Sequence, residues 1–197
     1  MDGLNAQFMA SPEDFLRRNP VGFKNNSPLE NALSEPEPRV EYLDLSRAKS
    51  GDGVELELFS SRGKPASWFS NKIKAYWLPW NEGHTTEVQL GDDAPYFFTS
   101  ELVGCRIQIA GDNASPTVLH IAGNIGTSSQ SRDRQARERL GDAVEGSRRY
   151  SRGKEDGYST IAFVCGYWDD ASDRWRILAQ ETSYANRKTS IKKVRYL

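Results

Sequence analysis

The sequence is poor in residues that bind metals or form disulfides. Among 197 residues it has two cysteines, Cys105 and Cys165, and two histidines, His84 and His120. A structural zinc site needs four ligands, and these four residues match no zinc-finger spacing. We therefore expect no metal and no other cofactor. At most one disulfide can form, and we expect both thiols to be reduced.

The sequence also lacks an excess of either charge and any long apolar run. Its 26 basic and 27 acidic residues give a net charge of -1, which excludes a domain-wide basic field for nucleic acid or anionic lipid. No apolar stretch approaches the roughly 20 residues that span a bilayer. The first ten residues lack the basic and apolar regions of a secretory signal peptide. We expect no direct nucleic-acid partner and no membrane partner.

Proline is concentrated at the N-terminus. Five of the nine prolines lie in residues 1–39, separated by Asn and Ser. Apart from a short helix at 11–18, this segment is typical of an extended linker. The sequence therefore predicts a proline-rich, partly disordered N-terminal arm at 1–39 and a single domain at 40–197.

From residue 40 onward, apolar residues alternate with polar ones, as in half-buried strands. We count about nine short strands and one helix, from Arg132 to about 145, and we expect a long polar loop at 146–157. The apolar positions of the helix are Ala136, Leu140 and Val144, and its expected surface carries Arg132, Arg134, Arg137 and Arg139. This pattern predicts an α+β fold: a β-rich sandwich of mixed sheets with α-helical insertions.

The residues most suited to chemistry lie between 97 and 121. Two strands joined by a turn at 111–113 would bring Cys105 and His120 side by side, and an imidazole that takes the thiol proton creates a nucleophile. Thr99 could hydrogen-bond the second imidazole nitrogen and fix its tautomer. Gly104 could help to present backbone N–H groups to an oxyanion.

Each of these residues also has an ordinary explanation. A buried cysteine is usually a small hydrophobic residue, and a histidine in a strand is usually structural. Alternating aromatic residues such as Trp77 and Trp80 belong to a core more often than to a substrate groove. Spacing alone leaves the catalytic and structural interpretations open.

Several short motifs resemble those of the glutamine deamidase toxins of the Burkholderia lethal factor and cytotoxic necrotizing factor family. The motifs are WLPW at 77–80, FFT at 97–99, L-x-G-C at 102–105, AGD at 110–112, and a strand that begins at Pro116 and ends in His120-Ile121. They cover about residues 72–122. The resemblance implies a cytotoxic necrotizing factor-like catalytic domain in which Cys105 is the nucleophile, with His120 and Thr99 completing a Thr-Cys-His triad. One position departs from the family motif, because Val103 stands where the family usually has serine.

The resemblance implies a toxin that converts a glutamine side chain of a target protein to glutamate through a cysteine thioester. It suggests two target classes, a host translation-initiation RNA helicase, whose loss would block translation, and a Rho-type GTPase. We expect a monomer that is made in the bacterial cytoplasm and acts in the cytosol of a host or target cell.

Two alternatives remain open from the sequence. The same Cys-His pair could act as a transglutaminase or a cysteine protease, because the acyl-enzyme can react with other nucleophiles. The other alternative is a non-catalytic β-sandwich binding module that retains an unreactive Cys-His pair.

Overall fold

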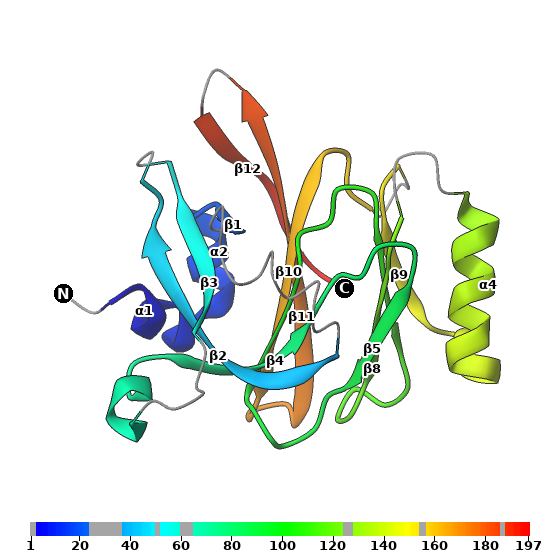
Figure 1. The fold of residues 1–197 in the computed structure, drawn as a ribbon, viewed down its shortest axis with the longest axis horizontal. Coiled ribbons are helices and arrows are strands. Elements are labelled where there is room, and N and C mark those ends of the chain that lie inside the picture. The colour runs from blue at the N-terminus through cyan, green and yellow to red at the C-terminus, as the bar shows by residue number, and fades with distance from the viewer. Residues whose placement is uncertain are drawn as a thin grey trace.

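The computed structural model describes residues 3–23, 37–49, 52–59, 65–123, 128–153, 157–185 and 188–197, and it consists mainly of two β-sheets (Figure 1). The larger sheet has eight strands in the order β1-β3-β2-β4-β6-β10-β11-β12. The smaller has four, in the order β5-β8-β7-β9. The pairs β1/β3 and β4/β6 are parallel, and the other described pairs are antiparallel.

The strands of the larger sheet are distributed along the whole chain. Their bounds are β1 Val21–Phe23, β2 Arg39–Arg47, β3 Val54–Phe59, β4 Ile73–Leu78, β6 Tyr96–Thr99, β10 Ile161–Asp169, β11 Arg174–Ala185 and β12 Lys188–Tyr196. The smaller sheet comes from the middle of the chain. Its strands are β5 Thr85–Gln89, β7 Arg106–Ala110, β8 Thr117–Ile121 and β9 Arg148–Ser151.

Helices are few and lie at the periphery. They are α1 Leu4–Ala10, α2 Pro12–Arg18 and α4 Ser129–Leu140, with short 3-10 turns η2 Ala66–Phe69 and η3 Gly141–Val144. The predicted α+β class is therefore wrong, because strands form both layers and the helices only cover them. The fold is a mostly β, sandwich-like arrangement. No helix in the described ranges is long and apolar enough to cross a membrane.

Two apolar cores explain why many strands are almost continuously hydrophobic. Successive side chains of a strand point to opposite faces, so a sheet covered on both faces needs apolar residues at every position. In β4, Trp77 lies in one core and its neighbours Tyr76 and Leu78 lie in the other. In β6, Phe98 and Phe97 divide in the same way.

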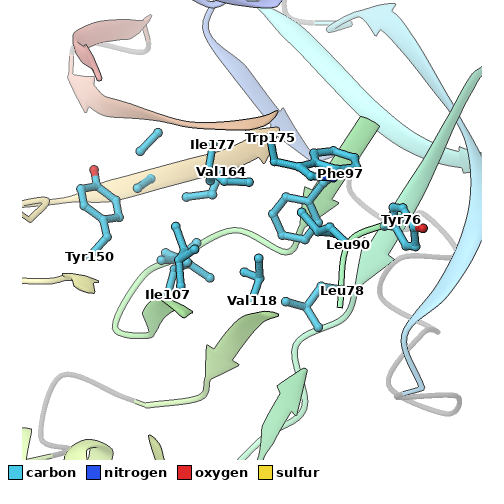
Figure 2. Packing of buried hydrophobic residues seen from close by; sticks show 14 of the residues in the cluster. Tyr76, Leu78, Leu90, Phe97, Ile107, Val118, Tyr150, Val164, Trp175 and Ile177 are labelled. Atoms are coloured by element: carbon cyan, nitrogen blue, oxygen red, sulfur yellow. The ribbon is translucent and has the colours of Figure 1, made fainter. Parts of the chain in front are cut away.

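The second of these cores fills the space between the two sheets. Figure 2 shows side chains from both sheets directed toward one another. Phe97, Val164 and Ile177 come from the larger sheet, and Ile107 and Val118 from the smaller.

The outer face of the smaller sheet is covered by α4. Leu119 and Ile121 of β8 pack against Ala136 of α4, with Leu140 and Val144 at the edge of this cluster. The helix expected from the spacing of Ala136, Leu140 and Val144 is therefore present, and its last apolar residue belongs to η3. The smaller sheet is covered on both faces, by the larger sheet and by α4.

The N-terminal segment differs from the expected arm. Residues 3–23 form α1, α2 and β1, and the buried side chains of Phe8, Phe15 and Leu16 belong to the same core as Trp77. Gln180 of β11 donates hydrogen bonds from its side chain to the backbone of α2, at Leu16 O. These residues therefore pack as part of the domain. The rest of the expected arm, at 24–36, lies outside the described residues.

The predicted polar loop at 146–157 contains a strand. Residues 148–151 form β9, which pairs with β7 and buries Tyr150 and Ser151 while Arg148 and Arg149 are exposed. Two exposed residues are followed by two buried ones, so this strand lacks the alternation by which strands are recognised in a sequence. Residues 154–156 lie outside the described residues.

Candidate functional site

The three residues predicted to form a triad lie close together between the two sheets. Thr99 is the last residue of β6 in the larger sheet, and His120 is in β8 of the smaller sheet. Cys105 lies directly before β7. All three are buried, with exposed fractions of 0% for Thr99, 1% for His120 and 4% for Cys105. Their catalytic roles remain predictions, whereas their positions are observed.

Thr99 fixes which imidazole nitrogen of His120 carries the proton. Its hydroxyl oxygen lies 2.8 Å from the backbone oxygen of Leu78, which can only accept, so the single hydroxyl hydrogen is donated there. The same oxygen lies 2.7 Å from Nδ1 of His120, and Nδ1 must therefore be the donor. The lone pair is then on Nε2, which is buried and has no hydrogen-bond partner among the described residues. This is the tautomer that a general base requires.

The position of Cys105 relative to His120 differs from the prediction by two residues. In the β7/β8 register, His120 lies opposite Ile107, so Cys105 and His120 are diagonal rather than direct neighbours. The thiol donates to the backbone oxygen of Gly123 at 3.7 Å. Diagonal side chains on one face are within reach of longer residues. Attack would require the sulfur to turn from Gly123 toward Nε2, and catalytic hydrogen bonds are often long before substrate binds.

Burial shifts both titratable groups toward their neutral forms. It lowers the pKa of His120 from 6.5 to about 3. It also raises the pKa of the Cys105 thiol, and this effect outweighs the backbone hydrogen bonds at Gly123, Gly104 and Val103 and the positive charge of Arg132, which act in the opposite direction. At neutral pH the resting pair is therefore an uncharged thiol and an uncharged imidazole, and the proton must move during attack rather than before it.

The shifted pKa of His120 makes folding stability depend on pH. Because its folded pKa lies below 6.5, the unfolded chain binds more protons, and stability falls as the pH decreases from 6.5 toward 3. We expect this residue to account for a loss of about 3 kcal/mol between pH 7 and pH 4. Urea unfolding at both pH values measures it.

Two variants separate this effect from other titrations. His120→Gln should lose this part of the pH dependence, and His84→Gln, at an exposed histidine, should retain it. Equal pH dependence in His120→Gln and the wild type would contradict the assignment of a low pKa to His120.

Sequence reasoning missed three residues that contact the loop before Cys105. Arg132 was expected on the helix surface, but it is 7% exposed and its Nη2 donates to the backbone oxygen of Gly104. Tyr158 Oη donates to the backbone oxygen of Cys105 at 2.8 Å, and Arg152 Nη1 donates to that of Val103 at 2.7 Å. The sequence predicts Arg132 on a helix surface and Arg152 in a polar loop, and no local pattern links these two residues or Tyr158 to the cysteine.

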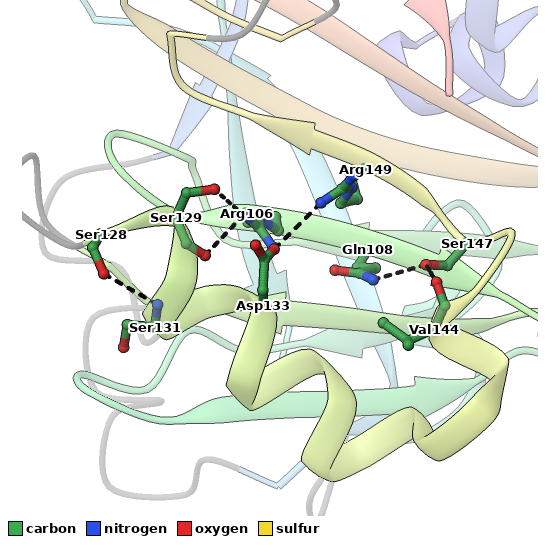
Figure 3. Close-up of polar contacts among 9 residues, drawn as sticks. All are labelled: Arg106, Gln108, Ser128, Ser129, Ser131, Asp133, Val144, Ser147 and Arg149. Carbon is green, nitrogen blue, oxygen red and sulfur yellow. Dashed lines mark hydrogen bonds and ion pairs between the residues drawn. The ribbon is translucent and has the colours of Figure 1, made fainter.

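An ion pair anchors α4 to β7 next to the cysteine. Arg106, whose side chain is 2% exposed, donates to Asp133 Oδ1 at 2.6 Å and to the hydroxyl of Ser129 at 3.1 Å (Figure 3). Arg149 of β9 shares the same carboxylate oxygen at 3.3 Å. Burial raises the pKa of Asp133, but the hydrogen bonds and charges of the two arginines outweigh it, so the net pKa is lowered.

We expect Asp133→Asn to destabilise the protein by about 1–3 kcal/mol, because a buried guanidinium loses its counter-charge. Urea unfolding at pH 7 measures this loss. Glu138→Gln is the matched control, since Glu138 is an exposed residue of the same helix and the charge change is identical. Equal stability of the two variants would show that the Arg106–Asp133 pair contributes nothing measurable.

The described structure offers little support for other kinds of site near Cys105. No group of three or more His, Cys, Asp or Glu residues among the described residues could hold a metal ion. Trp77 is fully buried in the core, so it lines no groove. A cavity of about 460 Å³ is lined by Ala94, Pro95, Ala114 and Trp168 among others. It lies at the turn end of the β7/β8 hairpin, whereas Cys105 lies at the open end.

Comparisons with known proteins give limited information. No protein-family model matches the chain, and no curated protein matches it. Among solved structures, the C-terminal domain of CNFy from Yersinia pseudotuberculosis is similar, with 10% sequence identity and a TM-score of 0.49. The match covers 100% of this chain and 97% of that chain.

This likeness concerns the arrangement of the backbone, and at this level of similarity it carries no argument about chemistry. None of these comparisons places the chain in the Burkholderia lethal factor family, so that part of the resemblance stays a prediction from the motifs at 77–121.

Proposed function

We propose that this protein is a toxin or effector that hydrolyses the side-chain amide of a glutamine in a target protein. Cys105 is the nucleophile, His120 the base and Thr99 the residue that orients the base. The observation that carries the proposal is the Thr99–His120 hydrogen bond at 2.7 Å, because it leaves the buried Nε2 unprotonated and without a hydrogen-bond partner among the described residues. The motif resemblance supports glutamine as the substrate side chain.

The reaction proceeds through a thioester. The sulfur of Cys105 attacks the amide carbon while Nε2 of His120 takes the thiol proton, and the carbonyl electron pair moves onto oxygen. Collapse of this oxyanion breaks the carbon–nitrogen bond, and His120 returns the proton to the leaving ammonia. His120 then takes a proton from water as the water oxygen attacks the thioester carbon. Collapse of this second oxyanion breaks the carbon–sulfur bond, and His120 returns the proton to the sulfur of Cys105. The products are glutamate and free Cys105.

The product explains how one modification could disable a target. Glutamate carries a negative charge where the target had a neutral amide, and an unpaired buried charge costs several kcal/mol. The resemblance supplies a translation-initiation RNA helicase and a Rho-type GTPase as target classes, and both belong to the cytosol of a host cell. Transglutamination differs only in that an amine replaces water at the thioester.

The buried thiol favours one alternative function. Burial raises the pKa of Cys105, and an unreactive thiol of this kind is expected in a non-catalytic binding module. The alternatives differ in their dependence on His120. A binding module predicts that Cys105 is never acylated, whereas the amidase predicts acylation that requires His120.

Mass spectrometry of a eukaryotic cell lysate tests the proposed function. The lysate is treated with wild type, Cys105→Ser or Cys165→Ser, and peptides are searched for glutamine-to-glutamate conversion. Cys165→Ser is the matched control, since Cys165 is a buried cysteine in the other core. We expect a glutamine converted by wild type and Cys165→Ser but not by Cys105→Ser.

Added amine in the same lysate distinguishes the enzymatic alternatives. Incorporation of a labelled amine at the same glutamine would identify a transglutaminase, and cleaved target peptides would identify a protease. Absence of any Cys105-dependent change in eukaryotic and bacterial lysates would contradict the amidase proposal.

A further inference from the structure

Three consecutive backbone carbonyls next to the candidate nucleophile are each held by a different side chain. Arg152 donates to the oxygen of Val103, Arg132 to that of Gly104, and Tyr158 to that of Cys105. Backbone oxygens in loops are usually satisfied by other backbone groups or water. Three side-chain donors on three successive peptides therefore indicate a loop whose peptide planes are fixed.

Fixing the orientation of one residue's carbonyl also fixes the orientation of the next residue's N–H group. In a trans peptide the carbonyl of one residue and the N–H of the next point in opposite directions, and the described residues contain no cis peptide. The donors to Val103 and Gly104 therefore aim the N–H groups of Gly104 and Cys105 away from Arg152 and Arg132. Successive N–H groups fixed in a bend, as at residues 103–104, are donors of the kind that can bind an anion.

The fixed loop lies beside the sulfur. Burial raises the pKa of the Cys105 thiol overall, and backbone hydrogen bonds at Gly104 and Val103 act against this increase. Arg132 also lies against both glycines next to the thiol, Gly104 and Gly123. A Cβ built on Gly123 would lie 2.6 Å from Arg132 Nη2, so its guanidinium lies against Gly123 while it donates to Gly104.

We propose that Arg132, Arg152 and Tyr158 are positioning residues that hold residues 103–105 so that the backbone N–H groups of Gly104 and Cys105 bind the oxyanion. This inference rests on the proposed amidase function. The three side chains contact the loop through its backbone oxygens. They act by holding N–H groups in place before the reaction, which is how an oxyanion site lowers the barrier without reorganising.

Two reactions of Cys105 distinguish oxyanion stabilisation from simple maintenance of the thiol. Acylation by p-nitrophenyl acetate passes through a tetrahedral oxyanion. Alkylation by iodoacetamide is a direct displacement with no oxyanion. A positioning residue should therefore affect acylation far more than alkylation, whereas a residue that only maintains the fold should affect both equally.

Tyr158→Phe is the mildest test variant, because it removes one oxygen and leaves the ring against Tyr150. We expect acylation of Cys105 to fall by up to about tenfold, less than for the loss of an oxyanion donor itself, because Tyr158 holds the peptide after Cys105 rather than either N–H group. Alkylation should change less than about twofold, since the thiol and His120 are untouched.

Arg152→Gln provides a second test with a matched control. Arg149→Gln makes the same charge change nearby, but Arg149 contacts Asp133 rather than the loop. We expect Arg152→Gln to lower acylation about tenfold and Arg149→Gln to leave it unchanged. Arg132→Lys, which retains the charge on a shorter donor, should retain more acylation than Arg132→Gln.

The outcomes separate this inference from the proposed function. Wild type that shows no acylation of Cys105 would overturn the amidase proposal and this inference with it. If wild type is acylated, two results would overturn only the positioning roles. One is that acylation and alkylation fall together in Tyr158→Phe and Arg152→Gln. The other is that acylation falls in neither variant.

Discussion

Cys105→Ala should abolish conversion of the target glutamine, with a loss of at least about 10⁴-fold. No other cysteine can replace it, because Cys165 is fully buried in the opposite core and burial strongly raises the pKa of its thiol. Cys105 is 4% exposed and lies in a loop held by side chains, so removal of its sulfur should leave the fold intact. The rate of glutamate formation, measured on the target identified in a lysate, tests this expectation.

The controls concern folding and the second cysteine. Cys105→Ala should unfold within a few degrees of wild type. Cys165→Ala should unfold at a lower temperature, with a loss of about 1 kcal/mol from the core, but should convert glutamine at the wild-type rate while folded. Activity retained by Cys105→Ala would show that another residue carries the reaction.

His120→Gln should lower the rate of conversion about 10³- to 10⁴-fold. The resting thiol is uncharged, so attack on an amide depends on a base that takes the proton in the same step. Glutamine retains hydrogen-bonding groups but cannot act as that base. Single-turnover kinetics with the identified target would measure the chemical step without product release.

Thr99→Val distinguishes the base from the residue that orients it. Valine is similar in shape but cannot accept the proton of Nδ1, so the tautomer of His120 is no longer fixed. We expect a loss of about 10- to 100-fold, and little further loss when this change is added to His120→Gln, because the two residues act as a unit. Additive losses would contradict the orienting role of Thr99.

Several parts of the fold could be predicted from local patterns. The apolar spacing of Ala136, Leu140 and Val144 correctly predicts the helix that covers the smaller sheet. Alternation and the turn at 111–113 correctly predict the antiparallel pairing of β7 and β8. These features depend on residues close together in the chain, where the period of the side chains is visible.

Other parts could not be predicted, because they depend on contacts between distant residues. Phe8 and Phe15 lie in the proline-rich N-terminal segment, but they are buried in a core that is built mostly from strands much further along the chain. β9 could not be predicted because its arginines are exposed, and it pairs only at the edge of the smaller sheet. Such elements are stabilised by tertiary packing rather than by local propensity.

The same limit applies to the candidate site. The sequence singles out Cys105, His120 and Thr99 as candidates, because each lies in a recognisable motif on a strand or beside one. The donors that hold the loop lie 28, 49 and 53 residues after their acceptors, in segments whose arginines and tyrosine resemble an ordinary surface. The two-residue offset between Cys105 and His120 depends on the register of β7 and β8, which the turn alone does not determine.

NMR of the imidazole nitrogens, on protein labelled with ¹⁵N-histidine, tests most directly whether Thr99 holds His120 as a neutral base. With two histidines in the chain, the His84→Gln variant assigns the signals. We predict a neutral ring with its proton on Nδ1, unchanged between pH 8 and pH 5, since the pKa of His120 is about 3. The proton should leave its fixed position in Thr99→Val. A proton on Nε2, or a charged imidazolium at pH 7, would contradict the proposed base.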